Sequence, residues 1–160
     1  MVFTRTQILG SIFVVLATVS VFSIESVRAD ESSDDSRDVL AAVNKFYDAF
    51  EAKSLDQLSH TVDTDLIVLE DTEKNMGWPD YRDNHIGKEM KEWKFFRAMN
   101  RKPVKIETHG TMAYAIMELT LEIGLLKKTI KLAAAETLIL VKVASGPWRV
   151  KHVHSSARKL

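Results

Sequence analysis

Four extended segments fill the last third of the chain, and the short links between them constrain the fold more than any other feature. These segments are dense in Val, Ile, Leu and Thr, and they cover residues 103–109, 112–123, 127–143 and 148–156. Links as short as His109-Gly110 connect neighbouring strands only when the strands run antiparallel. The sequence therefore predicts an antiparallel meander of four strands.

The second segment indicates which side of this sheet is buried. Its odd positions from 113 to 123 are all apolar, whereas Glu118 and Glu122 occupy even positions. One face therefore belongs to the core. The third segment is apolar on both faces over 132–141, so it is either a central strand or a strand whose outer side is covered by a second subunit. The second interpretation predicts a homodimer packed sheet to sheet.

Helices are expected ahead of the meander. Val39, Val43, Phe46 and Phe50 recur at spacings of four, three and four, which predicts an amphipathic helix over 36–52. A short helix opened by a capping box at Ser54, a strand over 66–70 and a helix from Gly77 to about Phe96 follow. Helices followed by an antiparallel sheet define an α+β fold.

The N-terminal residues have the pattern of a secretory signal peptide. An apolar stretch over 8–24 follows Arg5, and Val27-Arg28-Ala29 resembles a cleavage site. The apolar stretch is also at the lower limit of a membrane span, so an uncleaved anchor is the alternative. In both cases the domain faces a non-cytoplasmic space. We expect a periplasmic or secreted protein that has no membrane contact after cleavage.

This interpretation divides the chain into four parts. They are a signal peptide (1–29), an acidic flexible leader (30–37), the folded domain (38–156) and a basic C-terminal tail (157–160). The absence of cysteine excludes thiol nucleophiles, disulfides and cysteine-based zinc sites. The 22 basic and 22 acidic residues give no net charge, and no basic block is longer than two residues, so nucleic acid is not an expected partner.

Two motifs resemble those of a known family. Residues 77–89, Gly-Trp-Pro-Asp-Tyr-Arg-Asp-Asn-His-Ile-Gly-Lys-Glu, resemble the signature Gly-Trp-x-Asp-Tyr-Arg-Asp-His-His-Leu-x-Pro-Glu of a SnoaL-like subgroup. Residues 148–156 resemble the closing Trp-Arg-Ile-x-His-x-His-x-Ser strand of that subgroup. Asn84 and Lys88 depart from the first His and the Pro of the signature.

The resemblance covers residues 38–156 and implies the cone-shaped fold of the nuclear transport factor 2-like superfamily. This superfamily includes the ketosteroid isomerases and the SnoaL-like polyketide cyclases. The fold expected from it is α+β, with helices packed in the concave face of a curved antiparallel sheet.

Polar residues of the first motif share one face of the expected helix. At about 100° per residue, Arg82, His85 and Glu89 lie on the stripe that Trp93 marks as buried. Buried charges need partners, so we expect these side chains to meet one another or polar groups of the sheet.

The closing strand carries two histidines on its expected inner side. His152 and His154 have the same parity as Trp148 and Val150, whose bulk indicates the core face. A helix lying across that face would bring the residues of the first motif close to both imidazoles. The sequence thus predicts a pocket lined by histidines.

This pocket has eight candidate residues, each of which has structural packing as its alternative role. The catalytic candidates are His85, His152, His154 and Tyr47, and the ligand-binding candidates are Glu70, Trp78, Arg82 and Glu89. Tyr47 is similar in rough position to the tyrosine that isomerase relatives use as an oxyanion donor. Glu70 matches an acidic position of the SnoaL-like subgroup.

Three functions fit such a pocket. We favour an exported protein that binds a small, largely apolar molecule, with catalysis left open. A carbon-acid enzyme, such as an isomerase, cyclase or dehydratase, would use a histidine as its general base. A divalent-metal site is the third function, because imidazoles at positions i and i+2 of a strand plus one further ligand leave an open coordination position. The sequence identifies neither the ligand nor a cofactor.

Overall fold

The helices and strands are described for residues 24–144 and 146–160 of a computed structural model, and most of the predicted signal peptide lies outside these ranges. The helices are α1 (Ile24–Glu51), α2 (Leu55–Thr61), α3 (Trp78–Asp80) and α4 (Gly87–Glu92), with a π-helical turn, η2 (Tyr81–Ile86), between the last two. The strands are β1 (Val62–Glu70), β2 (Glu73–Met76), β3 (Phe95–His109), β4 (Met112–Gly124), β5 (Thr129–Lys142) and β6 (Trp148–Lys159). No helix within the described ranges is both long enough and apolar enough to cross a membrane.

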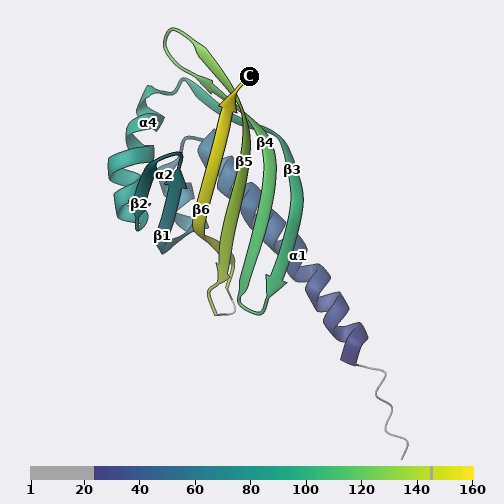
Figure 1. Cartoon of the computed structure of the whole chain (residues 1–160). Coiled ribbons are helices and arrows are strands. Elements are labelled where there is room, and N and C mark those ends of the chain that lie inside the picture. Colours follow the sequence, from purple (N-terminus) through teal and green to yellow (C-terminus); the bar gives the residue numbers. More distant parts are fainter. Residues whose placement is uncertain (1–23, 145) are drawn as a thin grey trace, which may run out of the picture.

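One curved sheet of six strands, in the order β2-β1-β6-β5-β4-β3, carries the fold (Figure 1). Strands β3 to β6 form the predicted antiparallel meander. β1 adds to the meander parallel to β6, and β2 pairs with β1 as an antiparallel edge strand. Figure 1 shows α1 crossing one face of the sheet, with α2 and α4 near the end formed by β1 and β2. The predicted α+β architecture is confirmed.

The core lies between α1 and the concave face of the sheet. Val39, Val43 and Phe46 of the predicted α1 stripe are all buried, as is Met117 from the apolar row of β4. The N-cap expected at Ser54 is also confirmed, because the backbone N–H of Gln57 donates to its hydroxyl, whereas the Ser54 N–H donates to the carbonyl oxygen of Ala49 and not to the side chain of Gln57. Hydrophobic periodicity therefore identified the buried faces of the first helix and of β4.

Both ends of the domain extend further than expected. α1 begins at Ile24, so the segment predicted as a flexible leader, 30–37, is helical. Within it, Asp35 forms an ion pair of 2.7 Å with Lys142 of β5. At the other end, β6 continues through Lys159, so most of the predicted tail is part of the sheet.

The helix expected over 77–96 is shorter and less regular. It consists of α3, η2 and α4, and it ends at Glu92 because Phe95 already begins β3. The strand β2 was not expected, since its residues Glu73–Met76 include two charged side chains and an asparagine. It forms because the edge of β1 offers backbone partners to a segment of low intrinsic strand propensity.

The π-helical turn moves Arg82 away from its expected place. The backbone N–H of Gly87 donates to the carbonyl oxygen of Arg82, and a Cβ at this glycine would overlap that oxygen. A π turn holds one residue more than an α turn, so a stripe counted at about 100° per residue does not continue across it. Arg82 instead pairs with Asp83 at 2.7 Å, with 43% of its side chain exposed.

An irregularity in β6 decides which of its side chains enter the concave side. Val150 pairs with Leu140 of β5 and His152 pairs with Ile139, so Lys151 is an extra residue between two cross-strand pairs. A bulge of this kind shifts the register by one residue. The side chains beyond it consequently exchange faces.

The predicted inward orientation of His152 and His154 is therefore wrong. Trp148 is buried before the bulge, as expected, but Val153 and Ser155 are the buried residues after it. The two histidines alternate with these residues and lie on the outer face of the sheet.

Candidate functional site

A cavity of about 80 Å³ lies between the helices and the concave face of the sheet. Aromatic rings form much of its wall: Phe46 meets Phe50 edge to face at 4.9 Å, and Trp93 stacks on Phe96 at 4.9 Å. The polar side chains that line the cavity are Tyr47, Glu70, Tyr81, Glu89, Glu136 and Ser155. The cavity is thus an apolar space with a small number of polar groups, as ligand pockets commonly are.

Three of these residues form a buried polar cluster: Tyr47 from α1, Glu136 from β5 and Ser155 from β6. The Tyr47 hydroxyl donates to Glu136 Oε2 at 2.8 Å, and the Ser155 hydroxyl donates to Glu136 Oε1 at 3.1 Å. All three side chains are buried. Each carboxyl oxygen therefore has one hydrogen-bond donor, which offsets part of the cost of burying it.

Burial controls the ionisation of this cluster. It raises the pKa of Glu136, and the hydrogen bonds from Tyr47 and Ser155 only partly oppose this effect. Burial also raises the pKa of Tyr47, and the neighbouring Glu136 raises it further, so the phenol remains a donor. Within the described residues, Glu136 has no ion pair with a basic side chain. The cavity thus contains a carboxyl group whose charged form is disfavoured.

The register of the sheet places a second carboxyl beside the cluster. Ser155 of β6 is the partner of Glu136 on β5 and of Glu70 on β1. The three residues therefore form a row across neighbouring strands, with steps of about 4.8 Å, and all three line the cavity. The parallel pairing of β1 with β6 is what brings Glu70 into this row.

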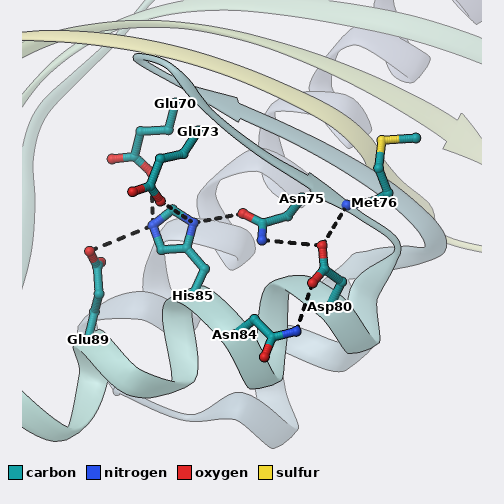
Figure 2. Close-up of polar contacts among 8 residues, drawn as sticks. All are labelled: Glu70, Glu73, Asn75, Met76, Asp80, Asn84, His85 and Glu89. Atoms are coloured by element: carbon teal, nitrogen blue, oxygen red, sulfur yellow. Dashed lines mark hydrogen bonds and ion pairs between the residues drawn. The ribbon is translucent and has the colours of Figure 1, made fainter.

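Glu70 also belongs to a histidine cluster at the rim of the cavity, which consists of His85, Glu70, Glu73, Glu89 and Asn75 (Figure 2). His85 Nε2 lies 3.7 Å from Glu70 Oε2 and 3.6 Å from Glu89 Oε1. His85 Nδ1 lies 2.7 Å from Asn75 Oδ1 and 3.8 Å from Glu73 Oε2. Only 9% of the imidazole is exposed, against 48% for Glu70 and for Glu89.

A carboxylate behind this cluster fixes the orientation of the imidazole. Asp80 Oδ2 accepts hydrogen bonds from Asn75 Nδ2 at 3.3 Å and from the Met76 backbone N–H at 2.9 Å, and Asp80 Oδ1 accepts from Asn84 Nδ2 at 2.9 Å. The amide oxygen of Asn75 is thereby turned toward His85, so Nδ1 is the nitrogen that donates (Figure 2). Nε2 therefore faces the carboxyl groups of Glu70 and Glu89.

The two glutamates at the rim are also disfavoured as anions. Burial on the cavity side raises the pKa of Glu70 and of Glu89, although about half of each side chain meets the solvent. His85 opposes this effect at both residues, whereas neighbouring carboxylates reinforce it. Glu70 and Glu89 are half-exposed and Ala157 is exposed, and all three line the cavity, so it meets the solvent on the side that these residues form, which we call the mouth.

Four of the eight predicted site residues come together in this structure. Tyr47, Glu70 and Glu89 line the cavity, and His85 contacts both glutamates. The helix of the first motif thus lies beside the end of β1 and not beside the predicted histidines of the closing strand.

The other four predicted residues lie elsewhere. His152 and His154 lie on the outer face of the sheet, and Arg82 is paired with Asp83 at the surface. Trp78 is buried and packs against Tyr81 at 6.4 Å, but it does not line the cavity. The predicted convergence of three histidines on one cavity does not occur.

Sequence reasoning missed two residues of the buried polar cluster, Glu136 and Ser155. A signal for Glu136 was present, because it interrupts an otherwise apolar inward row from Leu132 to Leu140 on β5. Ser155 had no comparable signal, since its inward position depends on the bulge at Lys151.

Metal binding was one of the three predicted functions. Across 24–144 and 146–160, no group of three or more His, Asp or Glu side chains has an arrangement that could hold a metal ion. His152 and His154, which suggested the site, lie on the outer face of the sheet, whereas Glu70 and Glu89 line the cavity on its inner side.

The curved sheet with helices in its concave face has the architecture of the nuclear transport factor 2-like proteins. Residues 39–158 match the family model of the SnoaL-like domain, so the chain belongs to the SnoaL-like family. Comparison with the curated proteins gives no match.

Solved structures with this architecture include proteins from several bacteria. A nuclear transport factor 2-like superfamily protein from Salmonella enterica serovar Typhimurium LT2 is 16% identical, with a TM-score of 0.71 over 78% of this chain and 91% of that one. A proposed ketosteroid isomerase from Shewanella frigidimarina is 22% identical, with a TM-score of 0.62 over 72% and 92%. A proposed dehydratase from Streptomyces avermitilis is 15% identical, with a TM-score of 0.70 over 79% and 97%. At these identities the likeness shows the fold alone.

Proposed function

We propose that this chain is an exported protein that binds a small, largely apolar molecule in the cavity of the cone. The observation that carries the proposal is Glu136, a buried carboxyl group in the wall of an aromatic cavity. An apolar residue at this position would avoid the cost of desolvating a carboxyl group. A carboxyl group that is present despite this desolvation cost can orient a bound ligand, as the few polar groups of a binding site do.

The dimensions of the cavity limit the ligand. A volume of about 80 Å³ holds only a few non-hydrogen atoms, so the enclosed part is a short branched chain or part of a ring. Any larger remainder of the molecule would extend toward the solvent at the mouth, where Glu70 and Glu89 lie. The proposed ligand therefore places an apolar body against the aromatic wall and a polar group near Glu136.

Native mass spectrometry of the chain purified from its own host tests this proposal. The expected result is a bound small molecule that Val153→Phe, which fills the cavity, abolishes. Val104→Phe is the matched control, because Val104 on β3 is 53% exposed and does not line the cavity. Equal retention by the two variants, or an empty wild-type protein, would overturn the proposal.

Export is a separate part of the proposal, supported by the apolar stretch after Arg5 and by the Val-x-Ala site before Asp30. N-terminal sequencing of the exported chain should begin at Asp30. A sequence that begins at Met1 or Val2 would instead indicate an uncleaved anchor.

We also propose that two copies pair through the outer face of the sheet. Support comes from β5, whose outward residues Ile139 and Val141 remain half-buried. Across the sheet Ile139 pairs with Tyr114 of β4 and His152 of β6, and Ile67 of β1 lies beyond His152. Sedimentation of the wild-type chain should give a dimer, and Ile139→Lys should give a monomer. A monomeric wild-type chain at high concentration would rule out this pairing.

Proton transfer on a carbon acid is a second candidate function, favoured by one observation. Glu70 and Glu89 have raised pKa values at the mouth, where a general base tuned toward neutrality is useful. Exchange of the α-protons of cyclohexanone in D₂O, followed by NMR, provides the test. Glu70→Gln should slow catalysed exchange by about 100-fold or more, while Glu118→Gln, an exposed control on β4, should not. No exchange above the buffer rate would exclude this function for that class of ketone.

A further inference from the structure

We infer that the ligand of this cavity is an organic cation, a protonated amine whose apolar part lies against the aromatic wall. This inference rests on the proposed binding function and specifies the chemical class of the ligand. It follows from the combination of carboxyl groups and aromatic rings around one space.

The described side chains that line the cavity include acidic groups but no basic groups. Three carboxyl groups line it, those of Glu70, Glu89 and Glu136, and none of its lining residues, all in the described part of the chain, is Lys, Arg or His. His85 beside the mouth supplies at most one positive charge against these three groups. Like charges repel more strongly in a desolvated space, so the cavity disfavours an anionic ligand and favours a cation.

The nearest guanidinium does not change this balance. Arg101 lies over the Tyr47 ring at 5.4 Å, but it forms ion pairs of 2.6 Å with Asp48 and 2.7 Å with Glu51. Its charge is therefore compensated by α1 itself.

The cavity is also a poor environment for its own carboxylates. Burial raises the pKa of Glu136 at the wall, and of Glu70 and Glu89 at the mouth. Hydroxyl donors satisfy one lone pair on each oxygen of Glu136, and further lone pairs remain for another donor. An ammonium group supplies both the opposite charge and the hydrogen-bond donors that these groups lack.

The aromatic wall favours an organic cation over a metal ion. Phe46, Phe50, Trp93 and Phe96 line the cavity, and aromatic rings attract alkylammonium groups within about 6 Å of their faces. These rings offer no ligand atoms to a metal. The described residues also contain no group of acidic and histidine side chains arranged for metal coordination.

The register of the sheet indicates where the ammonium group would lie. Glu70 and Glu136 flank Ser155 on adjacent strands, so their Cα atoms are about 10 Å apart. Carboxyl side chains that extend from both strands bracket the space in front of Ser155. A cation there would contact Glu136 and remain within the field of Glu70.

Three small probes of similar shape test the inference: isobutylammonium, isobutanol and isobutyrate. Each has about five or six non-hydrogen atoms, which suits the cavity, and NMR shifts of lining residues such as Val153 report binding at this site. Isobutylammonium is expected to bind at least about tenfold more tightly than isobutanol near pH 7, and isobutyrate most weakly.

Charge-neutral variants complete the test. Glu136→Gln should bring the preference for isobutylammonium over isobutanol to about onefold, and Glu70→Gln should reduce it. If Glu136→Gln does not fold because its side chain is buried, Glu70→Gln still tests the inference, because Glu70 is half-exposed and its substitution is less disruptive to folding. Glu118→Gln, a control with 61% of its side chain exposed that does not line the cavity, should leave the preference unchanged.

The outcomes separate the inference from the proposal beneath it. Equal affinity for isobutylammonium and isobutanol, with shifts at the lining residues, would overturn the organic cation and leave the binding function standing. The absence of shifts at those residues with every probe would overturn both.

Discussion

The buried polar cluster and the histidine cluster support their carboxyl groups in different ways. Each carboxyl oxygen of the buried Glu136 accepts one hydrogen bond, from the Tyr47 hydroxyl at 2.8 Å and from the Ser155 hydroxyl at 3.1 Å. Glu70 and Glu89 lie 3.7 Å and 3.6 Å from the imidazole of His85, distances too long for hydrogen bonds, and about half of each side chain is exposed. The carboxyl group of Glu136 is therefore held by directional hydrogen bonds, whereas the carboxyl groups of Glu70 and Glu89 only lie near an imidazole that is itself held by Asn75. Stability should depend mainly on the first cluster, and the response to ligands on both.

Tyr47→Phe should have the largest effect, because it leaves one oxygen of buried Glu136 without a donor. We expect a loss of about 1–3 kcal/mol in the free energy of unfolding, measured by urea denaturation at pH 7. Tyr114→Phe is the matched control, since this hydroxyl donates to Glu107 on the outer side of the sheet. A loss as small as that of the control would mean that the buried polar cluster contributes no more than a surface hydrogen bond.

The next largest effect is expected from the buried carboxyl group of Glu136, in the pH dependence of the free energy of unfolding. The pKa of folded Glu136 is raised above the ordinary value of 4.5, so the folded state holds this proton more tightly than the unfolded state. Its contribution to stability is fully present below the ordinary pKa and is lost as the pH rises through the raised pKa. Glu70 and Glu89 act in the same direction.

Glu136→Gln should consequently make this fall in stability shallower, as measured by denaturant midpoints over a pH series. Glu118→Gln, with 61% of its side chain exposed, should leave the fall unchanged. A steeper fall in Glu136→Gln would show that the carboxyl is stabilised as an anion.

His85→Gln should have a smaller effect on stability than Tyr47→Phe. It removes the bond between the imidazole and Asn75, which is worth about 0.5–1.5 kcal/mol in the free energy of unfolding. His109→Gln, at an exposed hairpin tip, is the control for thermal or urea unfolding. A loss larger than that of Tyr47→Phe would reverse the contrast between the two clusters.

His154→Gln should have the smallest effect. Its side chain lies on the outer face of β6, so the free energy of unfolding should change by no more than about 0.5 kcal/mol. Retention of a bound ligand in native mass spectrometry should match that of the wild type. A clear loss of ligand would mean that the strand beyond the bulge faces inward after all.

The sequence predicted the meander and the buried face of the first helix because each depends on a long periodic pattern. Six apolar residues at odd positions of β4 fix its inner face, and Val39, Val43 and Phe46 do the same for α1. Patterns of this length survive small local irregularities. The same holds for the α+β arrangement that follows from the order of the elements.

The candidate site was less predictable because it depends on two single-residue irregularities. The extra residue Lys151 in β6 exchanges the faces of His152 and His154, and the π turn at Gly87 moves Arg82 to the surface. The amino-acid composition around the bulge and around the π turn does not reveal either irregularity. A constant strand or helix periodicity extended through them therefore assigns the later side chains to the wrong face. Glu136, in contrast, lies in a regular strand and was detectable as a carboxyl in an apolar row.

The parallel pairing of β1 with β6 has a consequence for the order of folding. β1 lies early in the domain and β6 follows every other strand, so the row of Glu70, Ser155 and Glu136 closes only when distant parts of the chain meet. Contacts of such long sequence separation carry a high loop-closure entropy and tend to form late. The meander of β3, β4 and β5 can assemble from local turns before that step. The cavity is thus expected to become complete late in folding, and a nascent chain that lacks β6 lacks the part of the cavity wall that Val153 and Ser155 form.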